Sequence, residues 1–419
     1  MKLLFIINHY HSSVSPNIIN TNELIKFCLD KGDTIDILST DNVAFSGYPL
    51  IKKENRIRVF CFLNEYNKAV QKYNNSSISS FKNLPKHRKL VCKSFCFIKS
   101  LFKMKTGYYA VEAMSFRNIR ATIDKKYDVI MSESSPFVSH LIASYLIKKR
   151  CSDRWFPILF DPYAYNEIDK KSGINYRKYV EAKILKRATK VFQLMGIENI
   201  NHSKGYYPSY DNRCVSIPLF NLFERNVKYQ SPKKQSDIRM QYIGNFYYNL
   251  RNPGKMMDIL SLLPEQFEIH FAGGGCEKVI YEKSKLFNRS VFFNDGVLDY
   301  KIIESVYEKS DILLFLDNER GGQFPSKCFE YISYCKPIIN FYYDDSSLSY
   351  RFLRNYECSL HINLNKFKDS DVDKIISFCQ LSKNVIINYN AIIKQYSSFE
   401  KRHVLNGIYR LICGANEQS

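Results

Sequence analysis

Apolar runs of strand length alternate with amphipathic stretches of helix length along the whole chain. Residues 2–8 (KLLFIIN) form an apolar run. Residues 20–31 carry apolar side chains at helical spacing, up to Gly32, and residues 34–40 (TIDILST) alternate as a half-buried strand does. A strand, a helix and a second strand in close succession are the pattern of a β-α-β unit, which predicts a parallel sheet.

The same alternation recurs on both sides of a polar, charged stretch at 221–237 that is typical of a linker. Before the linker, further strands are predicted at 128–133, 157–163, 190–195 and 215–220, with helices at 137–149 and 176–188. After it, strands are predicted at 238–244, 268–273, 291–297, 312–318 and 337–341, with helices at 255–263, 299–309, 325–334 and again from 382.

This order predicts an α/β fold of two tandem Rossmann-like parallel-sheet domains facing across a cleft. The first domain would span 1–220, the second 238–395, and a C-terminal helix at 396–419 would cross back to the first domain. Ligands of such folds bind at the carboxyl ends of the strands, so the residues that follow each strand are the candidates for chemistry.

The charge is strongly positive: 61 Lys and Arg against 41 Asp and Glu give a net charge of +20. Ten of the cations lie in residues 66–111, which contain no acid. On a helical wheel, Lys89, Lys93, Lys99 and Lys103 lie opposite Val91, Phe95, Ile98 and Phe102. This pattern favours an anionic membrane surface as partner. An ordinary surface helix remains an alternative, and nucleic acid is disfavoured because no nucleic-acid motif is present.

Two further features bear on location and metals. The chain has no apolar run long enough to cross a bilayer and no pattern of a cleaved leader, so we expect a cytoplasmic protein, peripheral at the inner face of the cell membrane. The twelve cysteines are dispersed and no CxxC occurs, which predicts reduced thiols. Cys92 and Cys96 have His87 nearby but lack a fourth ligand, so we expect neither a metal nor another cofactor.

Glycines and cations follow the first two strands of the second domain. Gly244 and Asn245 lead to Arg251 and Lys255, which together with helix N–H groups suit an anion such as phosphate. A solvated loop is the alternative. Gly273 and Gly274 follow the next strand and allow close approach of the backbone to a ligand, or form a plain tight turn.

The segment GGQFPSKCFEYISYCKP, residues 321–337, has the densest set of candidates. Pro325 suits the first position of a helix, and Lys327 and Glu330 then lie on one face. The helix end and Lys327 suit a phosphate, while the Glu330 carboxylate suits a ribose diol. A surface Lys–Glu ion pair is the alternative.

Three stretches of the second domain resemble retaining glycosyltransferases of the GT-B fold, in the "group 1" nucleotide-sugar family. IRMQYIGNFYYNLRNP resembles the family's first strand and phosphate-binding turn in that domain, VFFNDGVLDYKIIESVYEKSDILLFL a second conserved stretch, and FPSKCFEYISYCKPII its P-S-K-x-x-E-Y signature. The opening strand, the Pro16 loop and TIDILST are similar to the family's N-terminal domain.

The resemblance implies a role for each matching position. Glu330 would bind the ribose of the donor, with Lys327, Pro325 and Ser326 near its diphosphate. Gly244, Asn245 and Arg251 would hold the phosphates, Gly296 and Val297 would contact the base, and Asp161 with Tyr163 would contact the acceptor. Lys255, Gly273 and Gly274 are further candidates for binding the donor. Arg251, Lys327 and Asp161 are the candidate catalytic residues. Gly322 stands where the family often has an acid, with Glu319 three residues away.

The implied activity is transfer of a sugar from a UDP- or GDP-sugar to a lipid-linked oligosaccharide or other saccharide acceptor, with retention and without a metal, in surface polysaccharide synthesis. No DxD sequence suited to a metal-bridged donor ends a predicted strand. A nucleotide-sugar epimerase on the same fold and a non-enzymatic polyanion-binding protein remain alternatives.

Overall fold

The computed structural model of the chain describes residues 1–7, 16–39, 56–61, 123, 126–134, 137–165, 173–225, 237–288, 290–298, 300–319, 324–383, 385 and 387–414. It divides into two compact units, Met1–Ile217 with Leu405–Ser419, and Pro218–Val404. Each unit contains one fully parallel sheet, so the predicted fold of two parallel-sheet domains is confirmed. The basic region at 66–111 and Gly322 lie outside the described residues.

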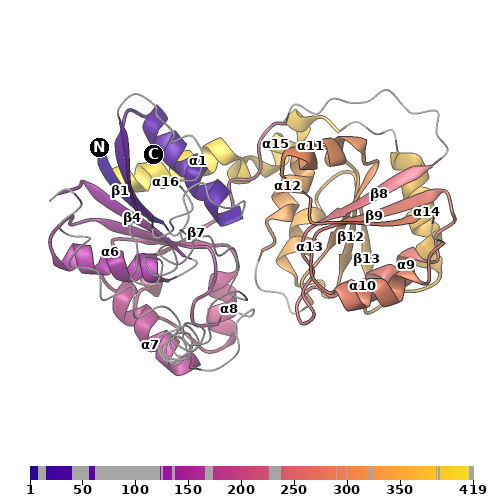
Figure 1. The fold of residues 1–419 in the computed structure, drawn as a ribbon, viewed down its shortest axis with the longest axis horizontal. Coiled ribbons are helices and arrows are strands. Elements are labelled where there is room, and N and C mark those ends of the chain that lie inside the picture. The colour runs from indigo at the N-terminus through magenta and orange to yellow at the C-terminus, as the bar shows by residue number, and fades with distance from the viewer. Residues whose placement is uncertain are drawn as a thin grey trace, which may run out of the picture. The chain divides into compact units, whose positions relative to one another are not determined.

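The first unit has a seven-stranded sheet in the order β3-β2-β1-β4-β5-β6-β7 (Figure 1). The strands are β1 (Lys2–Ile7), β2 (Thr34–Ser39), β3 (Ile57–Cys61), β4 (Val129–Ser134), β5 (Trp155–Leu159), β6 (Val191–Leu194) and β7 (Cys214–Ile217). The helices are α1 (Pro16–Asp30), α6 (Val138–Lys148), α7 (Ile174–Leu185), α8 (Ile197–Ser203) and α16 (Lys401–Cys413). Phe27 of α1 meets Tyr409 of α16 edge to face at 5.8 Å, so the end of the chain returns to this unit as expected (Figure 1).

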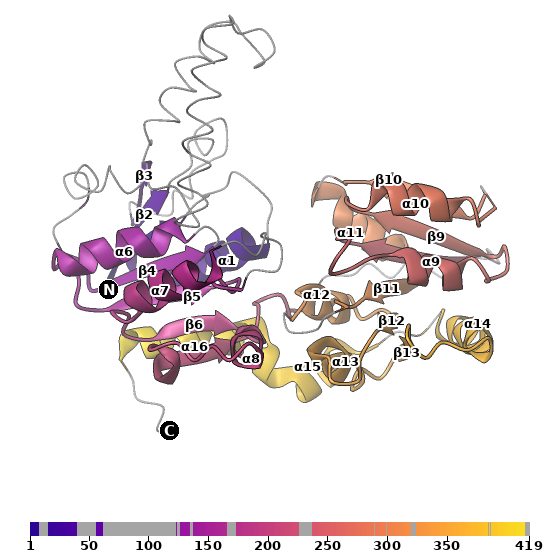
Figure 2. The same cartoon turned by 90° about the horizontal axis from the view of Figure 1, so that it is seen from below.

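The second unit has a six-stranded sheet in the order β10-β9-β8-β11-β12-β13. Figure 2 shows its two edge strands, β10 and β13. The strands are β8 (Ile238–Ile243), β9 (Phe267–Ala272), β10 (Phe292–Gly296), β11 (Ile312–Leu316), β12 (Ile338–Tyr342) and β13 (Ser359–Asn363). The helices are α9 (Gly254–Leu260), α10 (Glu277–Ser284), α11 (Tyr300–Lys309), α12 (Lys327–Ser333), α13 (Leu348–Leu353), α14 (Ser370–Ser382) and α15 (Tyr389–Tyr396).

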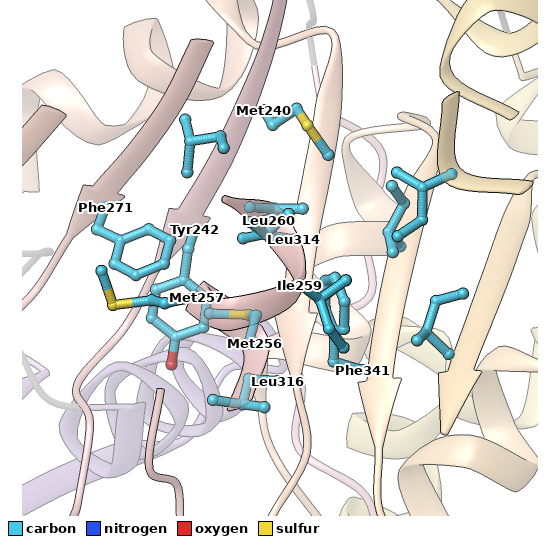
Figure 3. Packing of buried hydrophobic residues seen from close by; sticks show 14 of the residues in the cluster. Met240, Tyr242, Met256, Met257, Ile259, Leu260, Phe271, Leu314, Leu316 and Phe341 are labelled. Carbon is cyan, nitrogen blue, oxygen red and sulfur yellow. The ribbon is translucent and has the colours of Figure 1, made fainter. Parts of the chain in front are cut away.

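The core of the second unit anchors the loop that leads from β8 into α9. Met256 and Met257 of α9 are fully buried and pack, with Tyr242 and Phe271, in one apolar cluster on the sheet (Figure 3). Burying a methionine side chain contributes roughly 1.5–3 kcal/mol. Because α9 is held in this way, the residues between β8 and α9 are fixed at both ends.

Residues at the start of the predicted linker are part of the second unit. Ser333 of α12 accepts a hydrogen bond from the Phe223 N–H at 3.4 Å and donates one to the Asn221 carbonyl at 3.0 Å. The Lys401 N–H donates to the Leu222 carbonyl at 2.7 Å, so the two chain segments near the unit boundary run side by side. The beginning of this polar stretch is therefore not a free linker but is hydrogen-bonded to α12.

The elements of the structure differ from the sequence prediction in two ways. The strand expected at 157–163 spans Trp155–Leu159, so residues 160–163 belong to the loop that follows it. The sequence pattern did not reveal β3, α8, α10, α13, β13 or α14. All of these except α14 have eight residues or fewer, and short elements carry weak periodicity. None of the helices in the described part of the chain has the length and apolarity needed to cross a membrane.

Candidate active site

The loops after β8, β9 and β10 are joined by backbone hydrogen bonds. The Gly244 N–H donates to the Ala272 carbonyl at 2.8 Å, and the Gly273 N–H donates to the Gly296 carbonyl at 2.7 Å. Gly273 has a φ of +148°, and a Cβ there would lie 1.9 Å from the Gly244 carbonyl oxygen. The close approach that this glycine allows is therefore an approach to the neighbouring loop.

Asn245 and the next two glycines extend this contact between loops. The Asn245 Oδ1 accepts a hydrogen bond from the Gly274 N–H at 3.0 Å, and the Gly274 carbonyl accepts one from the Phe246 N–H at 2.8 Å. Gly275 has a φ of +88°, and a Cβ there would lie 2.2 Å from the Phe246 carbonyl oxygen. The structure thus gives Asn245 and Gly274 a role in joining the loops, and their contact with phosphate stays a prediction.

Gly296 and Val297 lie at the carboxyl end of β10, beside the same loops. Gly296 has a φ of +63°, which favours glycine, and the Val297 side chain is 81% exposed. Val297 is also the nearest side chain to a Cβ placed on Gly274, at 3.4 Å. An apolar side chain this exposed at a strand end is available to a ligand, so the predicted contact with a base remains open to test.

Arg251 is held by the end of β11. Its Nε and Nη2 both donate to the Asn318 Oδ1, at 3.2 and 2.8 Å, and it also hydrogen-bonds the Tyr242 hydroxyl. Arg251 is half-buried, and the charges of both Arg251 and Glu330 act on the Tyr331 hydroxyl of α12. The cation is therefore fixed where the ends of β8 and β11 meet α12.

Lys327 and Glu330 form a three-membered cluster with Tyr307 of α11. The Lys327 Nζ donates to the Glu330 Oε2 at 2.8 Å and to the Tyr307 hydroxyl at 3.0 Å, and that hydroxyl donates to the Glu330 Oε1 at 3.0 Å. The predicted single face for Lys327 and Glu330 is confirmed. Their ion pair is 22% and 19% exposed, so it is more enclosed than an ordinary surface pair.

The cluster keeps the Glu330 carboxylate ionised. Burial opposes its ionisation, but the charge and hydrogen bond of Lys327, with help from Arg225 and Tyr307, hold the pKa of Glu330 below its ordinary value. Burial and the adjacent Glu330 charge raise the pKa of Tyr307, so its hydroxyl stays a donor. A carboxylate has about four acceptor positions. The hydrogen bonds from Lys327 and Tyr307 occupy two of them, so the fixed carboxylate can accept from a ligand diol.

Pro325 and Ser326 lie directly before α12 in the chain. The expectation that Pro325 occupies the first helical position was wrong, because the helix begins at Lys327 and Ser326 is its N-cap. The Pro325 carbonyl accepts from the Cys328 N–H at 3.2 Å, which closes a turn before the helix. Both residues still lead directly into Lys327, and their contact with a diphosphate stays a prediction.

Lys255 lies on α9, away from the glycine loops. Its Nζ donates to the Asn365 Oδ1 at 2.8 Å and lies 5.7 Å from the centre of the Tyr343 ring. The structure therefore directs this cation toward the residues that follow β12 and β13. The predicted contact of Lys255 with a phosphate stays a prediction.

Asp161 lies in the first unit, two residues after β5, and is half-buried. Its neighbour Tyr163 is buried and stacks on Phe137 at 4.0 Å, so Tyr163 packs in the core and does not end a strand. The next residue, Ala164, donates its N–H to the Glu181 Oε2 of α7 at 2.9 Å. The loop that carries Asp161 is thus tied to α7.

Sequence reasoning missed Tyr307, Asn318 and Arg225. Asn318 stood at the end of a predicted strand, so the rule that strand ends carry chemistry could have found it. Arg225 lay in the supposed linker, yet its guanidinium stacks on Tyr334 at 4.4 Å and donates to the hydroxyl of that residue at 3.1 Å. For Tyr307 no signal existed beyond a tyrosine in a predicted amphipathic helix.

Within the described ranges, no group of three or more His, Cys, Asp or Glu side chains is placed to hold a metal ion.

No protein-family model matches the sequence, and no curated protein sequence matches it. Solved structures do match over nearly the whole chain. The lipopolysaccharide outer core galactosyltransferase WaaB, in its apo form, is 13% identical, with a TM-score of 0.58 over 99% of this chain and 100% of that chain. HepE of Anabaena, in complex with UDP-glucose, is 12% identical, with a TM-score of 0.63 over 99% of this chain and 100% of that chain.

WaaG, a glycosyltransferase involved in lipopolysaccharide biosynthesis, is 13% identical, with a TM-score of 0.55 over 98% of this chain and 100% of that chain. At these identities the likeness concerns the fold. This chain has two parallel α/β units in tandem, and its end returns to the first of them. The chain therefore has the GT-B fold.

Proposed function

We propose that the protein is a glycosyltransferase that moves a sugar from a UDP- or GDP-sugar to a lipid-linked oligosaccharide or other saccharide acceptor. The observation that carries this proposal is the ionised, half-enclosed Glu330 carboxylate, held by Lys327 and Tyr307 with acceptor positions left for a diol. The GT-B fold and the UDP-glucose bound by the similar HepE support a nucleotide-sugar donor. WaaB and WaaG act in lipopolysaccharide synthesis, which supports surface polysaccharide as the setting.

The proposed chemistry is electrostatic. When the bond between the sugar and the diphosphate breaks, negative charge grows on the leaving phosphate, and fixed cations stabilise it without reorganisation. Arg251 and Lys327 would supply these cations, and Lys255 would join them only after leaving Asn365. Asp161 would contact the acceptor from the first unit. We propose a retaining reaction that needs no metal.

The test is a screen of the purified protein against UDP- and GDP-sugars, with donor hydrolysis and transfer to saccharide acceptors as readouts. We expect one donor to be turned over, and Glu330→Ala to lower the affinity for the matching nucleotide by about 10- to 100-fold, since the lost hydrogen bonds involve a charged group. Turnover should persist in a chelator. Equal nucleotide affinities of wild type and Glu330→Ala, with no donor turned over, would contradict the proposal. Conversion of the donor sugar without an acceptor would indicate an epimerase.

We also propose that the protein binds the inner face of the cell membrane through residues 66–111. The support is the acid-free sequence with lysines on one side of its helical wheel. Replacing Lys89, Lys93, Lys99 and Lys103 by Glu should lower the affinity of the protein for anionic vesicles by at least about tenfold, since each cation near such a surface contributes about 1 kcal/mol.

The matched control reverses four exposed lysines of the second unit, namely Lys278, Lys285, Lys366 and Lys374, which changes the net charge equally. Co-sedimentation with phosphatidylglycerol-containing and neutral phosphatidylcholine vesicles measures both variants. Equal losses in the two variants would show a non-specific charge effect and contradict the membrane site. Donor binding should be unchanged in both.

A further inference from the structure

Two N–H groups of the Arg251 guanidinium donate hydrogen bonds to one uncharged acceptor, the side chain of Asn318, which follows β11. The Asn318 Oδ1 accepts from both Nε and Nη2, and Asn318 is only 4% exposed. Two hydrogen bonds from one planar guanidinium to one oxygen fix the orientation of the cation. Because the acceptor is an amide, it orients the guanidinium without neutralising its charge.

Asn318 is itself fixed by a buried carboxylate. Its N–H donates to the Asp317 Oδ1 at 2.7 Å, while the other carboxylate oxygen accepts from the Ser347 hydroxyl at the N-cap of α13. The Asp317 N–H also donates to the Phe341 carbonyl of β12 at 2.9 Å. Burial raises the pKa of Asp317, partly offset by hydrogen bonds that include those from Ser347 and Ser349.

The buried acid Asp317 and the cation Arg251 do not bind each other directly. Asp317 acts on Arg251 only through space, and no direct ion pair joins the two among the contacts of the described residues. Asn318 stands between them as the hydrogen-bonded partner. A carboxylate at position 318 would keep the geometry and form an ion pair with Arg251, which would compete with a phosphate for the same charge.

We propose that Asn318 is the positioning residue for Arg251, and that its neutral amide leaves the guanidinium charge available to the terminal phosphate of a nucleoside diphosphate. This inference rests on the proposed function and deepens it. It assigns the discrimination between a nucleoside diphosphate and a monophosphate to the pair Asn318–Arg251. Glu330 would bind the ribose, and Lys327 would lie near the phosphates of either nucleotide.

The probes are UDP with UMP and GDP with GMP, and the measured quantity is the ratio of diphosphate to monophosphate affinity for the full chain. Asn318→Asp should lower the diphosphate affinity by at least about tenfold and leave the monophosphate affinity within about threefold. Asn318→Ala should also lower the ratio, because Arg251 loses its acceptor. Asn388→Asp is the matched control, since Asn388 is an exposed N-cap of α15 and Asp caps a helix equally well.

A double-mutant cycle separates positioning from a merely structural role. In an Arg251→Met background, Asn318→Asp should change the ratio by less than about twofold, because the residue on which Asn318 acts is gone. If Asn318→Asp keeps the wild-type ratio, or lowers it equally with and without Arg251, the inference is overturned while the proposed function stands. If the wild type binds neither nucleoside diphosphate, the proposed function is contradicted and this inference with it.

Discussion

Gly273→Ala is expected to separate the loops after β8 and β9 and to abolish nucleotide binding in a protein that otherwise keeps its fold. A Cβ at this position would lie 1.9 Å from the Gly244 carbonyl oxygen and 2.6 Å from its carbon, and the backbone φ of +148° disfavours any side chain. Strain of this kind costs up to about 3 kcal/mol, and the clash with a fixed backbone adds to it. The segment between Gly244 and Arg251 would move with its loop.

Hydrogen exchange measured by mass spectrometry checks this locally. In peptides covering 238–246 and 267–275, amide exchange should accelerate by about 100-fold, which corresponds to roughly 3 kcal/mol of lost protection. The control is Gly407→Ala in α16, where a Cβ meets no described atom within 4 Å and helix propensity favours alanine by roughly 0.5–1 kcal/mol. Wild-type protection in the Gly273→Ala protein would contradict the role of this glycine.

Glu181 is expected to make the first unit lose stability as the pH rises from about 4.5 to about 7. The side chain is 1% exposed, and its carboxyl accepts hydrogen bonds from the Tyr210 and Tyr206 hydroxyls and the Ala164 N–H. Burial is the largest effect on it and, against these hydrogen bonds, raises the pKa of Glu181 from 4.5 to about 7. Between these values the folded protein holds a proton that the unfolded chain has released, so stability falls with rising pH.

The expected loss is about 3 kcal/mol, since each pKa unit corresponds to about 1.36 kcal/mol. Trp155 is the single tryptophan of the chain and is fully buried in β5, so its fluorescence reports urea unfolding of the first unit. In Glu181→Gln this pH-dependent loss should disappear. The stability of the variant relative to wild type should therefore rise by about 3 kcal/mol from pH 4.5 to pH 7.5.

In addition to this rise, we expect a pH-independent difference in stability between the two proteins, because the single amide oxygen of Gln cannot replace both carboxyl oxygens with which Glu181 accepts hydrogen bonds. Only the change with pH in the difference in stability between wild type and Glu181→Gln tests the titration of the carboxyl group. Parallel curves for wild type and Glu181→Gln would show that Glu181 titrates normally. Because the Ala164 N–H donates a hydrogen bond to this carboxyl, ionisation of Glu181 also acts on the loop that carries Asp161.

The fold could be predicted from the sequence because its signal is local. Buried parallel strands are short apolar runs, and the helices between them show apolar spacing, so strands such as β1, β8 and β11 were found within one or two residues. The error at β5 has the same origin. Phe160 and Tyr163 are apolar and buried like strand residues, but they belong to the loop that follows β5, and composition does not distinguish the two cases.

The candidate site could be predicted only in part. Lys327 and Glu330 are three residues apart, so helical geometry alone brings them together. Arg251 and Asn318 are 67 residues apart, and Tyr307 is 23 residues from Glu330. The contact between Arg251 and Asn318 depends on β11 lying beside β8 in the sheet. The contact between Tyr307 and Glu330 depends on α11 lying beside α12.

The sequence by itself determined the two parallel-sheet units, the strand ends where candidate residues gather, and the Lys327–Glu330 pair. These follow from periodicity and helical spacing, which act over a few residues. Only the tertiary structure decided that Gly273 approaches Gly244, that Lys255 turns to Asn365, and that Asn318 holds Arg251. Such contacts form when strands from distant parts of the chain become neighbours, and burial then makes each unpaired donor or acceptor costly enough to require a partner.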